Sequence, residues 1–503
     1  MSCSLRARVA FARGHDRMID RRSFKRFWLE ARRRLFQEPV DVALDSSPVD
    51  LRIVGRTLFH AVVVGAAAGL VGVLFVRALD SLQLVLLHGL VGYVPLRANG
   101  EDAVKAAAHF RWWLVVPVLF AGGLLSGLIM RWAPETRGGG ADATLEAYHS
   151  GQGHVRNRVL PAKFLASLFT LSSGGAGGRE GPTIQIGGAI GALASRLLKV
   201  NARERHILLL AGAAAGISAV FRTPLGAALL VVELVYDDGF ENDALVPSVL
   251  ASVVSYAIAT TVHPEGVLLA HNRYPFIPAH LPLYGALAIF TSLGAVLFLS
   301  LYETSKSFFK GLKVPDHYRP AIGAAFLGLF TLALVFALSK ALNVPMRGFG
   351  LLGGGYGLVQ VAITNAPWLG KGWVAVAFFA GMMVAKAIAT SFTVGSGGSA
   401  GDFAPSMAMG GLIGGAFGRA ARLIFDDPRI DPGAFVLVGM GAFYGGIAHV
   451  PLAALVMVCE IAGTYDLLVP AMLAQGIAFI ALRQHSLYHS QRKMPRVQPP
   501  PGS

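Results

Sequence analysis

Two short glycine-rich segments carry the residues whose types and spacing could hold an ion. They are Gly178–Arg179–Glu180–Gly181–Pro182 and Gly401–Asp402–Phe403–Ala404–Pro405. Glycine lets backbone amides point at one spot, and proline suits the first turn of the apolar helix that follows each segment. Because the positive end of a helix attracts anions, each segment predicts a place where an anion could bind.

Glu180 is the residue that could control such an anion site. Its carboxylate is itself an anion, so it would compete for the site when ionised and leave it when protonated. An alternative is a structural ion pair with Arg179, because ionisable groups inside a membrane are usually paired. The residue types alone leave both roles open.

The two segments are copies of one another within a tandem duplication. Residues 162–193 align without a gap on residues 385–416, and 14 of the 32 aligned positions are identical. Shared glycine and alanine raise such a count, but they would not also align Lys163 with Lys386. The chain therefore contains two related halves, each with one of the glycine-rich segments.

A second aligned block extends the duplication. Residues 208–237 match the later half at an offset of 227, which pairs Glu233 with Glu460. In the first block, Phe403 takes the position of Glu180. If the halves are inverted about the membrane midplane, the helices that follow both glycine-rich segments start at one centre.

The composition places these segments inside a membrane protein. Of 503 residues, 54% are hydrophobic, 15% are charged and 60 are glycine. Soluble domains average about 25% charged residues. Several apolar runs are shorter than the roughly 20 residues of a straight crossing, which predicts broken or re-entrant helices around a transport site. The predicted fold class is an all-α polytopic membrane protein.

The formal net charge of +15 includes a group of arginines before the first apolar run. By the positive-inside rule this arm is cytoplasmic, and the basic tail predicts the same for the C-terminus. Binding to nucleic acid is the weaker interpretation, because a basic segment beside a membrane more often faces the lipid headgroups. No secretory signal peptide is visible at the N-terminus.

We therefore divide the chain into a basic cytoplasmic arm, a first membrane half, a linker, a second membrane half and a cytoplasmic tail. In that order, the predicted boundaries are 1–56, 57–302, 303–318, 319–483 and 484–503.

Two further features are weaker by themselves. Arg137–Gly138–Gly139–Gly140 is a third glycine turn, and Tyr488 follows the last apolar run, where a tyrosine is usually an interfacial anchor. Cys3 and Cys459 do not form a disulfide framework, and no metal site or cofactor is predicted.

Together these motifs resemble the CLC family of chloride channels and chloride/proton antiporters, over about residues 58–490. The family's GREGP motif stands at 178–182 and its GxFxP motif at 401–405. Two stretches, 221–233 and 451–461, resemble the family's paired helices. The resemblance implies about eighteen helices in two inverted halves, and a homodimer with one anion pathway per subunit.

The resemblance also implies roles for single residues. Glu180 matches the gating glutamate, and Arg179 would brace its loop. The backbone amides of Asp402, Phe403 and Ala404 would donate hydrogen bonds to the anion. Tyr488 matches the family's late anion-coordinating tyrosine.

The third glycine turn departs from the family pattern. The family's GSGIP motif reads Gly138–Gly139–Gly140–Ala141–Asp142 here. Gly139 and Gly140 would thus line the anion site, but the serine hydroxyl is missing at Gly139. We expect its contact to be lost or to pass to backbone or water.

Two more departures concern acidic groups. The inner proton-relay glutamate of many exchangers is replaced by Leu234, which cannot carry a proton. Asp402 places a carboxylate beside the anion site, and we expect its side chain to point away, because an ionised acid would repel the anion.

The shared repeat position of Glu233 and Glu460 favours a structural capping role for both, with proton relay by Glu233 as the alternative.

These features predict chloride transport through a voltage- or pH-gated channel with a glutamate gate. The alternative is a proton-coupled chloride antiporter of the same family, and a more distant one is a cation-coupled carrier of an organic solute. An enzyme is not predicted, because the apolar runs lack HExxH, Gly-x-Ser-x-Gly and paired aspartate motifs. The pattern expected for fluoride export is also missing.

Overall fold

The computed structural model describes residues 51–99, 109–262, 267–344, 348–364, 366 and 368–494. The chain divides into two compact units, 1–56 and 57–503, and the helices below belong to the second unit except for the first residues of α3. Residues 1–50 of the basic arm predicted for 1–56 lie outside the described residues.

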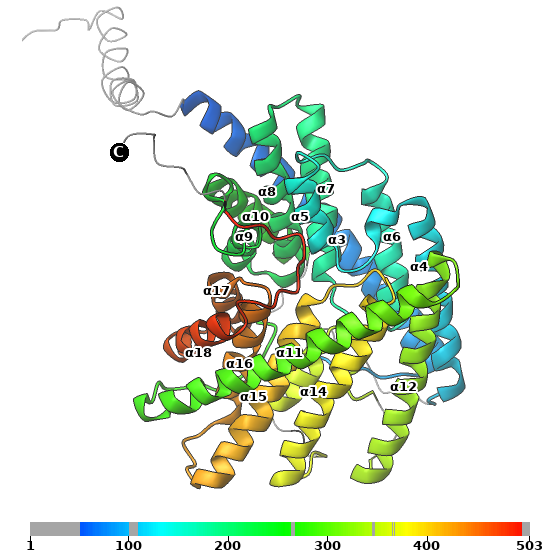
Figure 1. The fold of residues 1–503 in the computed structure, drawn as a ribbon, viewed down its shortest axis with the longest axis vertical. Coiled ribbons are helices and arrows are strands. Elements are labelled where there is room, and N and C mark those ends of the chain that lie inside the picture. Colours follow the sequence, from blue (N-terminus) through cyan, green and yellow to red (C-terminus); the bar gives the residue numbers. More distant parts are fainter. Residues whose placement is uncertain are drawn as a thin grey trace, which may run out of the picture. The chain divides into compact units, whose positions relative to one another are not determined.

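The described residues contain sixteen α-helices and no strand, against about eighteen helices expected. In chain order (Figure 1) they are α3 (Leu51–Gln83), α4 (Val115–Trp132), α5 (Ala141–His149), α6 (Val159–Ser172), α7 (Glu180–Leu197), α8 (Ala202–Phe221), α9 (Pro224–Glu233), α10 (Asn242–Val262), α11 (Leu281–Gly311), α12 (Arg319–Leu342), α13 (Tyr356–Thr364), α14 (Trp373–Val394), α15 (Phe403–Phe425), α16 (Pro432–Ile447), α17 (Pro451–Ala462) and α18 (Leu468–Ala481). A π-helical stretch, Leu84–Val91, follows α3 directly.

Seven helical stretches in this part of the chain are long and apolar enough to cross a membrane. Others, such as α9 and α17, are apolar but shorter than a crossing. Both short helices carry proline at their first position, where the missing N–H has no intrahelical partner to lose. The chain is thus an all-α polytopic membrane fold with broken helices, as the sequence predicts.

The helices repeat with the spacing of the sequence duplication. Helices α7 and α15 begin at positions that the first aligned block pairs, and α9 and α17 begin at positions that the second block pairs. Within each half, two long helices pack closely: α7 lies against α8 and α15 lies against α16 (Figure 1).

Glycine makes this close approach possible in both halves. A Cβ atom at Gly187 of α7 would collide with the carbonyl oxygen of Gly212 in α8. The repeat-related pair is Gly410 of α15 and Gly439 of α16, and a Cβ atom at Gly410 would collide in the same way. Small residues at these crossings bring the helix backbones together where lipid supplies no hydrophobic drive for association.

Helix α11 is longer than the sequence predicts. It contacts α14, α15, α16 and α18, and Figure 1 shows it as a long helix that runs across them. The helix continues to Gly311, so the first half of the predicted linker 303–318 is helical. The apolar pattern fades after residue 302 because the last turns carry the exposed polar residues Glu303 and Lys306.

Candidate anion-binding site

The two glycine-rich segments meet in the structure. The amide of Gly178 donates to the carbonyl of Gly401 at 2.7 Å, and the amide of Gly401 donates back to the carbonyl of Gly178 at 2.7 Å. Helix α7 begins two residues after Gly178 and α15 begins two residues after Gly401. The positive ends of two repeat-related helices therefore start at one centre, as the duplication predicts.

Glu180 lies in this centre and is buried, with 1% of its surface exposed. Its Oε2 atom occupies the space where a Cβ atom at Gly178 would lie, and the Cβ of Ala404 is 2.9 Å from the same point. Neither carboxylate oxygen has a hydrogen-bond partner among the described residues. The side chain thus lies against the start of α15 without being fixed there by a hydrogen bond.

The start of α15 has the backbone geometry of an anion site. The first N–H groups of a helix have no intrahelical acceptor, so the amides of Phe403 and Ala404 are donors of this kind. The first turn is closed by the amide of Ser406, which donates to the carbonyl of Asp402 at 3.0 Å. The Ser406 hydroxyl donates to the same carbonyl at 2.7 Å.

The expectation that the Asp402 side chain points away from the site is wrong. The Tyr488 hydroxyl donates to Asp402 Oδ1 at 3.0 Å, and both residues are buried. Asp402 Oδ2 lies 3.2 Å from the point where a Cβ atom at Gly139 would stand. The carboxylate fits here because Gly139 has no side chain and because a hydroxyl donor faces it, so a carboxylate takes the space beside Gly139 that we assigned to backbone or water.

Gly140 belongs to the same centre but has a packing role. Its φ of +100° is in the left-handed region that favours glycine, and it is the residue before α5. A Cβ atom there would stand 2.6 Å from the carbonyl oxygen of Gly181 and 3.1 Å from Lys163 Cε. The third glycine turn is therefore packed directly on the start of α7.

Two buried lysines support the turns, one from each half. Lys163 of α6 donates to the carbonyls of Thr136 and Gly138 at 3.1 and 2.7 Å. Its repeat partner, Lys386 of α14, donates to the carbonyls of Leu351 and Gly353 at 2.9 and 2.5 Å. The duplication aligns these lysines but does not by itself give them a role, and their identity across the repeat is the signal that could have found them.

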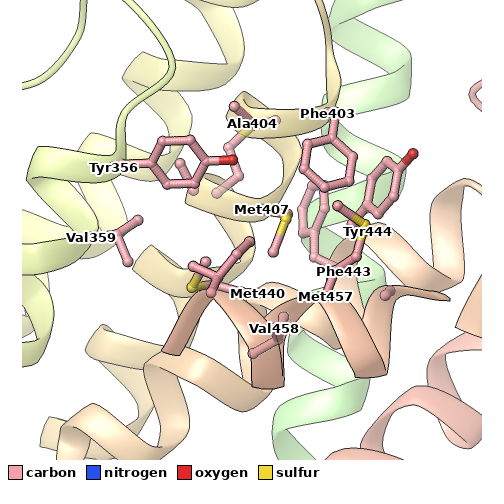
Figure 2. Packing of buried hydrophobic residues seen from close by; sticks show 14 of the residues in the cluster. Tyr356, Val359, Phe403, Ala404, Met407, Met440, Phe443, Tyr444, Met457 and Val458 are labelled. Carbon is pink, nitrogen blue, oxygen red and sulfur yellow. The ribbon is translucent and has the colours of Figure 1, made fainter. Parts of the chain in front are cut away.

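Aromatic side chains close the site around α15. Figure 2 shows Phe403 beside Tyr444, and their ring centroids lie 4.3 Å apart in an edge-to-face arrangement. Phe221 contacts Phe403 from another side, with ring centroids 5.3 Å apart. The Tyr444 hydroxyl lies 3.3 Å from the Tyr488 hydroxyl. These rings keep the region between the helix starts apolar except for a few hydroxyl and carboxylate groups.

Two cavities reach the site from different elements. One is lined by Gly178, Arg179 and Glu180 together with residues 353–357. The other is lined by Tyr488 together with Glu303, His449, His485 and His489. Glu180 thus borders one cavity and Tyr488 borders the other, while Asp402 lies buried behind Tyr488.

Over residues 121–483 the sequence matches the family described as voltage gated chloride channel. The chain belongs to this family, the CLC family. Among curated relatives, the H(+)/Cl(-) exchange transporter ClcA of Vibrio cholerae serotype O1 (strain M66-2) is 32% identical over 432 residues, which cover 83% of this chain and 84% of that protein. The chain is therefore an integral, multi-pass membrane protein of a chloride-transport family.

Solved structures show the same CLC fold. A slow cyanobacterial Cl−/H+ antiporter superposes with a TM-score of 0.70 at 22% identity, over 85% of this chain and 94% of that chain. A CLC-type fluoride/proton antiporter also gives 0.70 at 19% identity, over 89% of this chain and 100% of that chain. At these identities the likeness concerns the fold alone.

The two repeat-related glutamates of this CLC protein cap each other's helices. Glu233, the last residue of α9, accepts hydrogen bonds from the amides of Leu452 and Ala453 at 3.1 and 2.7 Å, at the start of α17. Glu460, in α17, accepts from the amides of Leu225 and Gly226 at 3.2 and 2.8 Å, at the start of α9. Each carboxylate thus satisfies helix N–H groups that lack an intrahelical acceptor.

Proposed function

We propose that the chain is a proton-coupled chloride exchanger of the CLC type, with Glu180 as the group that both gates chloride and carries the proton. The observation that carries this proposal is the position of the Glu180 carboxylate, which is buried, lies against the start of α15 and has no hydrogen-bond partner among the described residues. Such a group can give up its place to an anion at little cost in hydrogen bonds.

The names of the relatives support exchange over a channel. The Vibrio cholerae relative is an H(+)/Cl(-) exchange transporter, and a structural neighbour is a Cl−/H+ antiporter. The channel hypothesis rested on Leu234, which cannot relay a proton. It remains the outcome that the experiment below must exclude.

In the proposed mechanism chloride sheds water and is held by the backbone amides at the start of α15. Ionised Glu180 competes with chloride for the positive ends of the helices. A proton neutralises the carboxylate, which then leaves the helix start and admits chloride. Because more Glu180 is protonated at lower pH, chloride flux should rise as the pH falls.

The test is chloride and proton flux in proteoliposomes with an outward chloride gradient. An exchanger drives protons uphill, whereas a channel reverses at the chloride equilibrium potential and moves no protons. We expect uphill proton movement by the wild type. Glu180→Gln should lose it and should conduct chloride without dependence on pH.

The control for this experiment is Glu146→Gln, which removes an exposed carboxylate of α5 and should keep the coupled fluxes. Wild-type chloride flux without any proton movement would refute exchange. A wild-type pH dependence in Glu180→Gln would refute the gating role of Glu180.

We further propose that both termini face the cytoplasm of a bacterium and that two copies form a homodimer with one pathway in each. The basic arm supports the orientation through the positive-inside rule. Labelling of cysteines introduced at both ends, in sealed cells and after permeabilisation, tests the orientation. Cross-linking in native membranes tests the dimer.

A further inference from the structure

A second carboxylate lies in the pathway, and the mechanism above gives it no task. Asp402 is the residue before α15, and 5% of its surface is exposed. Leu234 cannot carry a proton, and Asp402 is a buried carboxylate on the Tyr488 side that could take over this task. An ionisable residue buried in a membrane protein is costly, and such residues usually mark an ion or proton route.

On one side, the Tyr488 hydroxyl separates Asp402 from a cavity. The Tyr488 hydroxyl donates to its Oδ1 atom, and Tyr488 itself lines the cavity that also contains Glu303 and His489. His489 Nε2 lies 3.1 Å from Glu303 Oε1 in that region. A proton that arrives through this cavity therefore meets titratable groups up to the hydroxyl that touches Asp402.

On the other side, Asp402 is electrostatically linked to Glu180. Asp402 directly follows Gly401, and Glu180 lies two residues after Gly178, the glycine that pairs with Gly401, so the two acidic residues stand at one centre. Because like charges repel, a proton on Asp402 makes ionised Glu180 less costly, and a proton on Glu180 does the same for Asp402. One proton shared between the two carboxylates is therefore favourable.

The charged groups around Asp402 favour neither protonation state alone, because one attracts the negative charge of its carboxylate and another repels it. Lys163 of α6 attracts its negative charge, whereas Asp142 of α5 repels it. The Tyr488 hydroxyl contacts the carboxylate directly, and the hydroxyl of Tyr444 in α16 lies next to that of Tyr488. Lys163 donates to two carbonyls and not to the carboxylate, so Asp402 is not fixed in a direct salt bridge among the described residues.

We propose that Asp402 is the proton-relay carboxylate on the Tyr488 side of the pathway and does the task that Leu234 cannot do. The inference rests on the proposed exchange function. The Asp402 carboxylate takes a proton from the cavity bordered by Tyr488 and releases it to the Glu180 carboxylate. The O–H bond of protonated Asp402 breaks as the O–H bond of Glu180 forms, so Asp402 is ionised again and Glu180 is neutral until it releases the proton on its own side of the pathway.

Gly139 is part of this arrangement. Asp402 Oδ2 stands 3.2 Å from the position that a Cβ atom at residue 139 would take, so a larger side chain there would crowd the carboxylate. The glycine in place of the family's serine and the aspartate at residue 402 thus complement each other in space. The relay is built from two departures from the family pattern that touch one another.

The experiment compares protons moved per chloride in proteoliposomes of the full chain. We expect the wild type to pump protons uphill, and Asp402→Asn to move at least about tenfold fewer protons per chloride, because an amide cannot take up and release the proton. Asp402→Glu keeps a titratable group and should restore part of the coupling. Asp243→Asn, at an exposed ion pair on α10, should keep the wild-type ratio.

The measurements on the wild type and on Asp402→Asn distinguish failure of the relay proposal from failure of the exchange proposal. If the wild type pumps protons and Asp402→Asn moves the same number of protons per chloride, the relay is overturned and exchange is left intact. A wild type that moves chloride and no protons would overturn exchange and the relay with it.

Tyr488→Phe decides the question if Asp402→Asn does not fold. Its hydroxyl donates to the ionised carboxylate, so its loss favours the protonated form, and the pH of half-maximal proton flux should move upward. An unchanged midpoint would overturn the role of Asp402, since a purely structural Tyr488 would not set that pH.

Discussion

At the scale of single residues, Gly178 determines where the proposed gate rests. Glu180 Oε2 fills the space that a Cβ atom at Gly178 would need, and Ala404 Cβ is close to the same point. Gly178→Ala should therefore displace Glu180 from the start of α15, at a packing cost of about 1–3 kcal/mol. We expect chloride flux at neutral pH to rise toward its acidic level.

The measurement for this variant is chloride flux between pH 4 and 8 in proteoliposomes, beside a thermal melt in detergent. Gly381→Ala is the matched control, because a Cβ atom at Gly381 meets no atom within 4 Å. A wild-type pH profile in Gly178→Ala would mean that Glu180 does not depend on this space.

The site could be predicted from sequence only where the information is local. Glycine and proline around Glu180 and Phe403 predict both helix starts to within one turn, because each side of the duplication reinforces the other, although the helices begin at Glu180 and Phe403 and not after the prolines. The direction of the Asp402 side chain could not be predicted. It depends on the empty space at Gly139 and on the hydroxyl of Tyr488, which the fold brings together from three distant parts of the chain.

At the scale of elements, the reciprocal caps of α9 and α17 connect the two halves. Each of Glu233 and Glu460 accepts two amide hydrogen bonds at the start of the other helix. Hydrogen bonds to charged groups contribute about 1.5–3 kcal/mol. Changing either glutamate to alanine removes two such bonds and should thus lower stability by about 3–6 kcal/mol, and changing it to glutamine, which keeps one acceptor oxygen, should cost less.

Thermal melts of the purified variants test this prediction, and flux measurements separate it from the proton-relay alternative for Glu233. A capping role predicts similar losses of stability for Glu233→Ala and Glu460→Ala. If Glu233→Ala instead keeps its stability and loses proton coupling, Glu233 is a relay and not a cap.

Element boundaries show the same limit of sequence reasoning. The short helices could be predicted because proline marks their first positions and the repeat aligns them. The end of α11 could not, because its last turns carry polar residues that look like a linker once they leave the apolar pattern. Hydropathy reports where a helix meets an apolar environment and not where its hydrogen bonds end.

At the scale of the whole described molecule, the segment after α18 joins the two halves at the site. In the second half, the Tyr488 hydroxyl donates to Asp402. In the first half, the amide of Ser490 donates to Asp142 Oδ1 at 2.8 Å, and the amide of Asp237 donates to the carbonyl of Arg492 at 3.1 Å. The position of Tyr488 is therefore set by contacts to both halves.

Asp142 is the residue that anchors this segment two positions after Tyr488. Asp142→Ala should release the segment and weaken the hydrogen bond from the Tyr488 hydroxyl to Asp402. It should therefore change the chloride-to-nitrate selectivity in the same direction as Tyr488→Phe. Because both changes act on one hydroxyl, the double variant should differ little from Tyr488→Phe alone, which is a coupling of about 0.5–3 kcal/mol when expressed as free energy.

Reversal potentials in mixed anions measure this selectivity, with exposed Asp466→Ala as the control. Additive effects would show that Asp142 acts on the anion independently of the tyrosine, and unchanged selectivity in Tyr488→Phe would reduce the tyrosine to an anchor.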